Sequence, residues 1–148
     1  MKAIVILCDG EFPRNAYPLY LLDSADAVVC CDRAVLKYLR YGKRRYGEER
    51  LPEAVVGDMD SLPKGWQERL ATLIVHEEEQ DYNDLTKAMR YVLKAHPDAT
   101  DIHILGAGGR REDHTVGNLG LLMEYPRLLP LGDIRVDMVS DYSTAFAV

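Results

Sequence analysis

The 148-residue chain has few cysteines, no long apolar run and no excess of basic residues. Its three cysteines, Cys8, Cys30 and Cys31, show no CxxC spacing. This pattern excludes a disulfide framework or a cysteine-based metal site, and it predicts a reducing, cytoplasmic environment. No stretch approaches the roughly 18 apolar residues that a membrane span needs. We therefore expect a protein with no membrane association.

The charge balance is acidic. Lys plus Arg number 18 and Asp plus Glu number 24, which gives a net charge of −6. A nucleic-acid-binding protein needs a broad basic footprint, so we expect no nucleic-acid partner. One basic cluster occupies residues 43–50 and is half neutralised by Glu48 and Glu49. We interpret it as a solvated loop.

Short apolar runs alternate with helix-like segments along the chain. Strand candidates occupy 3–8, 27–31, 54–56, 72–75, 101–105 and 134–140, and helix candidates occupy 17–24, 33–41, 64–71, 83–95 and 114–124. Repeated strand-then-helix order predicts an α/β fold with a three-layer, mostly parallel, Rossmann-like sheet that carries helices on both faces. The whole of 1–148 is expected to be one domain. Its last residues, "YSTAFAV", resemble an unfinished strand.

Polar and glycine-rich segments follow the predicted strands directly. In order they are "DGEFPRN", Asp32, "GDMDS", "HEEEQDYND" and "GAGGRREDH". Because ligands of parallel α/β sheets bind at the carboxyl ends of the strands, we expect these segments to gather at one edge and form the site.

The "GDMDS" segment offers two aspartates separated by one residue. In an extended segment Asp58 and Asp60 point the same way, and paired carboxylates favour a cation such as Mg²⁺ between them. Gly57 would let the backbone pass close to a ligand. The alternative is a turn followed by a helix that Ser61 caps.

The "DYNDLTKAM" segment places Asp81 and Asp84 at the start of the clearest helix. Their simplest interpretation is helix capping and compensation of the helix dipole. Capping does not account for the whole acidic run, so metal binding stays open. Lys87 either pairs with Asp84 on the surface or reaches a phosphate.

The "LGAGGRREDHTVGN" segment joins a strand to a helix through a glycine-rich loop. Such a loop can turn backbone N–H groups toward an anion, and arginine guanidinium groups suit phosphate oxygens. It has neither the Walker A order nor the GxGxxG order. Taken alone, His114 fits a residue that simply opens the helix. The candidate binding residues of this segment are Gly108, Gly109, Arg110, Arg111, Asp113 and His114.

Together the three segments, "GDMDS", "DYNDLTKA" and "GGRREDHTVGN", resemble the thiamine pyrophosphokinase family in both motif and order. The resemblance covers the catalytic domain and implies transfer of the β,γ-diphosphate of ATP to thiamine, with AMP released and Mg²⁺ required. It also implies a homodimer in the full-length protein. Family members carry a second, β-rich sandwich domain that supplies much of the thiamine pocket, and we expect it to be absent from this chain.

The motifs and the resemblance together assign roles to individual residues. Candidate catalytic and metal-binding residues are Asp58, Asp60, Asp81 and Asp84, and candidate nucleotide- and phosphate-binding residues are Asp32, Gly57, Ser61, Lys87, Gly108, Gly109, Arg110, Arg111, Asp113 and His114. Asp81 or Asp84 would accept the hydroxyl proton of thiamine. Arg111 would contact phosphate and offset developing charge.

The sequence departs from the family pattern at two places. Both glycines of the family's "DGG" segment are replaced, since Asp32 is followed by Arg33 and Ala34. Two residues separate Arg110 from Asp113 where the family has one, so either arginine could be the motif residue; we prefer Arg111. Two other functions remain open: a nucleotide sensor without turnover, and a nucleotide-sugar transferase that uses the DxD pair.

Overall fold

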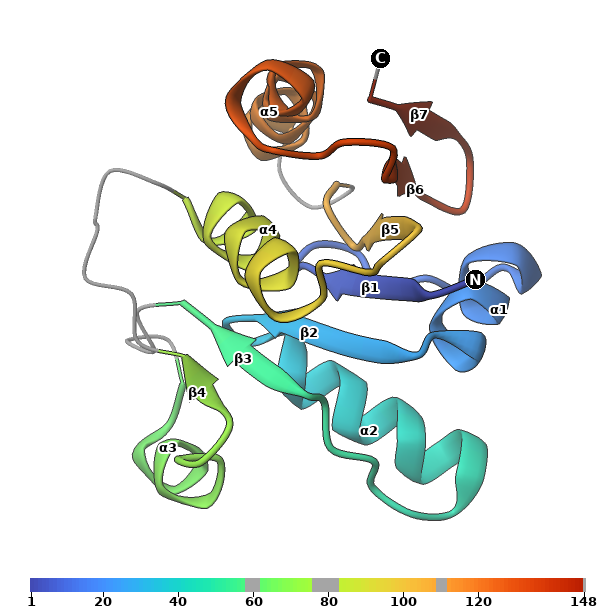
Figure 1. Ribbon diagram of the computed structural model, residues 1–148. Helices are drawn as coiled ribbons and strands as arrows, with labels where there is room; N and C mark the ends of the chain where they lie inside the picture. Colours follow the sequence, from blue (N-terminus) through green and yellow to red (C-terminus); the bar gives the residue numbers. More distant parts are fainter. Residues whose placement is uncertain (58–61, 76–82, 109–111, 148) are drawn as a thin grey trace.

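The structure is a computed structural model that describes residues 1–57, 62–75, 83–108 and 112–147, with 112–116 described as backbone only. These residues form a seven-stranded sheet in the order β4-β3-β2-β1-β5-β6-β7 (Figure 1). The strands are β1 (Ala3–Leu7), β2 (Ala27–Cys31), β3 (Ala54–Val56), β4 (Ile74–Val75), β5 (Asp101–Leu105), β6 (Arg135–Val139) and β7 (Thr144–Phe146). Each adjacent pair from β4 to β6 is parallel, and β7 pairs antiparallel with β6.

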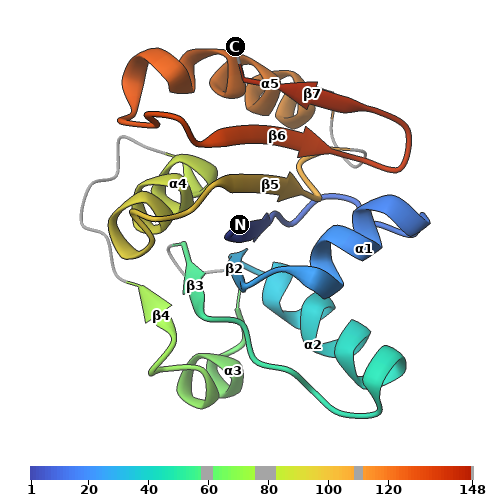
Figure 2. The same cartoon turned by 45° about the vertical axis from the view of Figure 1, so that its right-hand side comes forward.

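Helices cover both faces of the sheet (Figure 2). They are α1 (Ala16–Ser24), α2 (Ala34–Tyr46), α3 (Lys64–Arg69), α4 (Asp84–Ala95) and α5 (Glu112–Leu128). One core cluster joins α4 and α5 to the sheet, and the other joins α1, α2 and the residues that flank α3 to the opposite face. The prediction of a three-layer, mostly parallel α/β fold is confirmed.

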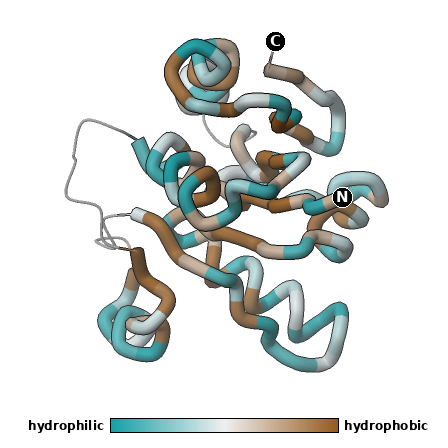
Figure 3. The backbone as a smooth tube through the Cα atoms, in the orientation of Figure 1, coloured by the Kyte–Doolittle hydropathy of each residue, from teal (hydrophilic) through white to brown (hydrophobic). Residues whose placement is uncertain are grey.

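The continuous apolar strands explain the two buried faces. Successive side chains of a strand point to opposite sides. In β1, Ile4 and Ile6 enter the core beneath α4 and α5, whereas Val5 and Leu7 enter the other core, and all four are 0% exposed. Figure 3 shows the same pattern as hydrophobic strands between helices of mixed character. A strand with no polar side has to lie inside such a sandwich.

The predicted element boundaries need three corrections. Helix α2 continues to Tyr46, so Lys43, Arg44 and Arg45 lie in its last turn and the interpretation of residues 43–50 as a loop is wrong for them. Gly47 ends the helix in a left-handed conformation, with φ of 79°. The second correction concerns α3, whose N-cap residue is Pro63, so the expectation that Ser61 caps this helix is wrong.

The third correction concerns α5, which is longer than expected because it spans residues 112–128 rather than 114–124. The C-terminal segment that resembles a strand does contain one, β7, which pairs with β6. None of the helices in the described part of the chain is long and apolar enough to cross a membrane.

Candidate functional site

A cavity of about 620 Å³ lies at the carboxyl ends of the central strands. Strand order reverses between β1 and β5, which are neighbours in the sheet although β2, β3 and β4 lie between them in the chain. Such a reversal leaves a crevice where the two following loops diverge. The lining residues are Cys8, Asp9, Gly10, Cys31, Asp32, Asn83, Asp84, Leu85, Gly106, Ala107, Gly108 and Asn118.

Two loops, one after β1 and one after β5, approach each other closely at one side of the cavity. The Gly10 N–H donates to Gly106 O at 2.7 Å, and the Glu11 N–H donates to Gly108 O at 2.8 Å. A Cβ atom at Gly10 would lie 2.3 Å from Gly106 O. One at Gly106, whose φ is +70°, would lie 2.6 Å from Cys8 O. The close contact of the loops therefore requires glycine at both positions.

Asp9 extends the wall that follows β1. Its carboxylate forms an ion pair with Lys37 Nζ at 3.1 Å, and the same ammonium group donates to Gly10 O at 2.7 Å. The Asp9 side chain is 35% exposed and that of Lys37 is 20% exposed. Lys37 thus ties α2 to the loop and holds one carboxylate at the cavity.

Asp32 follows β2 with a left-handed backbone, φ 54°. Aspartate adopts this conformation more readily than most residues other than glycine. The Asp32 N–H donates to Val56 O at 2.8 Å, which anchors the turn to the end of β3. Arg33 has an ordinary φ of −68° and Ala34 begins α2. The two replaced glycines of the family segment therefore lie where the backbone accepts any L-residue.

The first turn of α4 supplies the third acidic residue. Asn83 caps this helix, because its side-chain oxygen accepts the Thr86 N–H at 2.9 Å. This cap fixes Asp84 in the first helical turn, half-buried at the cavity. The Cys31 thiol donates to the Asp84 main-chain oxygen at 3.8 Å, which joins the helix to β2.

The buried thiols of Cys8 and Cys31 complete the floor of the cavity. The hydrogen bond with Cys8 and burial raise the pKa of the Cys31 thiol well above its ordinary value. A thiol with a raised pKa stays protonated near neutral pH and is a poor nucleophile. These cysteines therefore act as small packing residues, in agreement with the sequence interpretation.

Asn118 of α5 lines the cavity next to the loop that follows β5. Its side-chain amide donates to Ala107 O at 2.9 Å and so supports the loop that follows β5. The cavity thus combines carboxylates with two glycine-containing loops. Carboxylates would repel a bare polyanion, so this lining suits a phosphate ligand that arrives with a divalent cation.

Several predicted residues gather here. Asp32, Asp84 and Gly108 line the cavity, and Gly57 follows β3 at the same sheet edge with φ of 145°. Asp113 and His114 lie in the first turn of α5, which is described as backbone only. The other predicted residues, Asp58, Asp60, Ser61, Asp81, Gly109, Arg110 and Arg111, lie outside the described residues.

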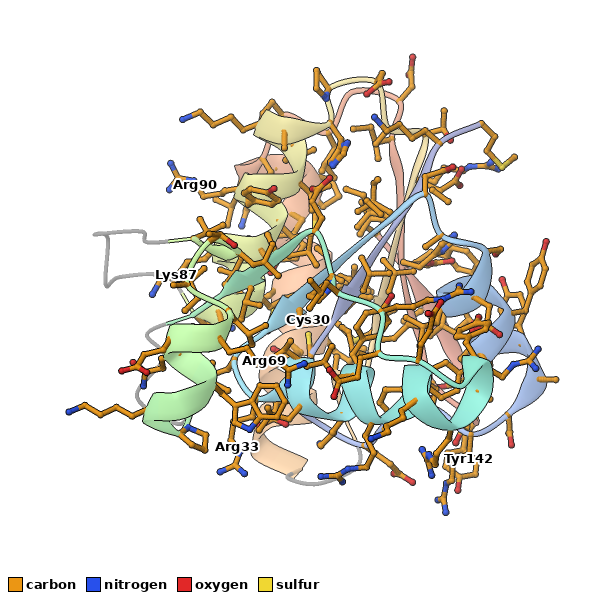
Figure 4. The ribbon with its side chains drawn as sticks, turned by 90° about the horizontal axis from the view of Figure 1, so that it is seen from below. Cys30, Arg33, Arg69, Lys87, Arg90 and Tyr142 are labelled. Carbon is orange, nitrogen blue, oxygen red and sulfur yellow. The ribbon has the colours of Figure 1, made fainter. Side chains whose placement is uncertain are left out.

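Lys87 does not line the cavity. It is 9% exposed on α4 and forms no ion pair with another described residue, so the surface pairing with Asp84 is wrong. Figure 4 shows its amine at the edge of the molecule, on the side where α3 and α4 lie. No three His, Cys, Asp or Glu side chains of the described ranges cluster closely enough to hold a metal ion.

Four polar or glycine lining residues had no individual role assigned from the sequence: Asp9, Gly10, Asn83 and Asn118. Asp9 and Gly10 belong to the segment "DGEFPRN", which the strand-end rule had placed at this edge of the sheet. Asn83 carries a signal as a helix-capping residue. Asn118 gave no local signal, since its role depends on contact with a loop 11 residues away.

Comparison with known proteins identifies the family. A family model described as "Thiamin pyrophosphokinase, catalytic domain" matches residues 19–129. Thiamine pyrophosphokinase of Bacillus subtilis (strain 168) is 36% identical over 128 residues, 82% of this chain and 55% of the relative. Thiamine pyrophosphokinase 1 of Oryza sativa subsp. japonica is 32% identical over 103 residues, 64% of this chain and 37% of the relative. The chain therefore spans only part of the curated relatives it matches.

Solved structures agree with the sequence relatives. Thiamin pyrophosphokinase from Geobacillus thermodenitrificans aligns with a TM-score of 0.68 and 28% identity over 93% of this chain and 59% of that one. Yeast thiamin pyrophosphokinase aligns with a TM-score of 0.72 and 17% identity over 94% of this chain and 58% of that one. This alignment shows that the two chains share a fold. These relatives do not favour a nucleotide-sugar transferase. The family model matches residues 19–129, well over half of the 148 residues, so the chain belongs to the thiamine pyrophosphokinase catalytic-domain family.

Proposed function

We propose that this chain forms the nucleotide-binding half of an enzyme that transfers diphosphate from ATP to thiamine and releases AMP. The observation that carries the proposal is the cavity at the strand ends, where Asp9, Asp32 and Asp84 face the glycine-containing loops. Membership of the thiamine pyrophosphokinase family supports the choice of reaction. Phosphoryl-type transfer requires mainly positioning and charge neutralisation. The lining would position the substrate, and a divalent cation held by its carboxylates would supply the neutralisation.

The loop after β5 and the start of α5 would bind the triphosphate. Gly108 lies at the cavity, and α5 begins at Glu112. The N–H groups of a helix N-terminus favour an anion, and the guanidinium of Arg110 or Arg111 would add charge-assisted hydrogen bonds. Asp113 and His114 follow in the first turn. Gly57 and Ser61 would complete the phosphate contacts.

The acidic residues fit Mg²⁺ in kind, because their carboxylates are hard oxygen donors and two of them, Asp32 and Asp84, converge on one cavity. Asp84 together with Asp58, Asp60 and Asp81 would hold the ion. A bound Mg²⁺ would neutralise phosphate charge and orient the phosphate oxygens. Asp32 would then face the nucleotide from the β2 turn.

A carboxylate near the attacking hydroxyl has to take its proton. Asp84 or Asp81 would serve, since the Asn83 cap fixes this end of α4 beside the cavity. Thiamine would attack the β-phosphorus in line, with AMP as the leaving group. Arg111 would stabilise the charge that develops on the transferred diphosphate.

Three further features belong to the same proposal: thiamine contacts supplied by a β-rich second domain, a homodimer, and a cytoplasmic location. The last is supported by the three cysteines, all buried and free of disulfides. Free cysteines of this kind are typical of proteins in reducing compartments.

The test is a product assay on the complete natural protein with ATP, Mg²⁺ and thiamine. We expect AMP and thiamine diphosphate in equal amounts, and no AMP when thiamine is omitted. Asp84→Asn should suppress both products, whereas the matched change Asp98→Asn, at an exposed site far from the cavity, should not. Absence of AMP above background, or release of ADP in its place, would refute the proposal.

A further inference from the structure

A second cavity, of about 500 Å³, lies between α2 and the segment that joins β1 to α1. Its lining residues are Glu11, Phe12, Pro13, Arg14, Leu19, Lys37, Arg40, Tyr41 and Arg44. Among the described residues, the two cavities share no lining residue. Four of the nine carry a positive charge and one a negative charge, although the chain as a whole has a net charge of −6.

The four cations of this cavity differ in their partners. Arg14 forms an ion pair with Glu11 at 2.7 Å, and Lys37 forms one with Asp9 at 3.1 Å. Arg40 and Arg44 are exposed, and neither forms an ion pair with another described residue. They are four residues apart on α2, so their guanidinium groups project from one helix face. Two unneutralised guanidinium groups on one face can clamp a single phosphate.

The cavity also has apolar and aromatic lining residues, among them Phe12, Leu19 and Tyr41. Phe12 contacts Tyr41 with ring centroids 5.3 Å apart, and Leu19 packs against the same core cluster. The Tyr41 hydroxyl donates to Asp23 Oδ1 at 2.8 Å, so its proton already has an acceptor within the protein. Burial and the Asp23 carboxylate raise the pKa of Tyr41 to about 12, so the ring stays neutral. An aromatic or aliphatic group could therefore rest on these residues.

We propose that this cavity binds a small organic phosphate, with the phosphate on Arg40 and Arg44 and the apolar part on Phe12 and Leu19. The volume falls within the range of small-molecule sites. The combination of apolar with cationic lining residues excludes a purely apolar ligand and favours an anion with a ring or chain attached. The proposal does not depend on the reaction proposed above, because it involves a separate set of lining residues.

Phenyl phosphate is the probe, and backbone amide chemical shifts of the isotopically labelled chain are the readout. We expect shifts in residues 11–14 and 37–44, with phenol and inorganic phosphate each binding more weakly than phenyl phosphate. The double change R40E/R44E should weaken binding by about tenfold or more, because it reverses both charges that face the phosphate. If R40E/R44E lost its native spectrum, R40Q/R44Q would replace it, with the same expected direction.

The matched control is K64E/K94E, which alters net charge equally at two exposed lysines on α3 and α4, outside this cavity. Its affinity for phenyl phosphate should stay within about twofold of the unchanged chain, since charge at a distance is screened by salt. Two outcomes would overturn the proposal: shifts confined to the strand-end cavity, or equal weakening by the two double changes. Equal binding of phenyl phosphate and inorganic phosphate would overturn the assignment to an organic phosphate.

Discussion

The two edges of the sheet use their acidic residues differently. At the amino edge, each of several carboxylates is tied to a local partner. Asp26 accepts the Ala3 N–H at 2.8 Å, Asp101 pairs with Arg135 at 3.1 Å, and Glu53 lies 2.7 Å from His96 Nε2. These contacts bind strand ends and neighbouring segments together.

At the carboxyl edge, Asp9, Asp32 and Asp84 line a cavity of about 620 Å³. Backbone conformation is also less ordinary here, because Asp32, Gly57 and Gly106 all have positive φ. Strain and grouped charges persist where function requires them. The comparison therefore teaches that acidic residues of the amino edge join neighbouring segments of the fold, whereas those of the carboxyl edge line the cavity in which we propose that the substrate binds.

The largest effect is expected from Asp58→Asn combined with Asp60→Asn in the complete protein. Turnover of ATP and thiamine should fall by at least about 100-fold, because the metal loses charged ligands. The thermal midpoint should change little, as measured by circular dichroism. If the variant kept full activity, the assignment of Asp58 and Asp60 as metal ligands would be wrong.

Gly106→Ala tests whether the carboxyl edge depends on close loop contact. The added Cβ would lie 2.6 Å from Cys8 O in a left-handed backbone, so the free energy of unfolding should fall by about 3 kcal/mol. Urea denaturation measures it. Gly120→Ala is the control, since a Cβ added at this position in α5 would meet no atom within 4 Å, and it should raise stability by up to about 1 kcal/mol.

Glu53→Ala tests the stabilising role of the amino edge. Glu53 accepts a hydrogen bond from Tyr91 and contacts the nearly buried His96 ring, so its loss should cost about 2 kcal/mol of unfolding free energy. ATP affinity, measured by calorimetry, should not change. The exposed Glu48→Ala should stay within about 0.5 kcal/mol. If Glu53→Ala lowered ATP affinity and left stability unchanged, the stabilising role assigned to the amino edge would be wrong.

The smallest effect is expected at Asn83, which both caps α4 and lines the cavity. Asn83→Ala removes the cap of α4 and should lower the free energy of unfolding by about 1 kcal/mol. Asn83→Ser keeps a capping oxygen and should retain most of that stability. Equal losses for the two variants, measured by urea denaturation, would argue against the cap.

Much of the fold followed from local sequence patterns. Continuous apolar runs such as Val5 to Leu7 predicted strands buried on both faces, and strand-helix alternation predicted the parallel sheet. The prediction that polar segments gather at the carboxyl edge is confirmed for Asp32, Asp84 and Gly108. For the motif residues that lie outside the described ranges, the assignments remain predictions.

Other features depended on contacts that a local pattern does not contain. Gly10 and Gly106 lie 96 positions apart in the chain and need glycine only because β1 pairs with β5. The pairing of Lys37 with Asp9 is likewise a tertiary contact. The last turn of α2 was mistaken for a loop because its exposed basic residues, Lys43 to Arg45, carry no apolar periodicity.

The most direct test of the central claim is a crystal structure of the complete protein with a non-hydrolysable ATP analogue and Mn²⁺, whose anomalous signal locates the metal. We predict that the triphosphate and the anomalous peak lie at the carboxyl edge, beside Asp32 and Asp84 and against the Gly106–Gly108 loop. A nucleotide and metal found at the amino edge, or in the cavity of Arg40 and Arg44, would contradict the account.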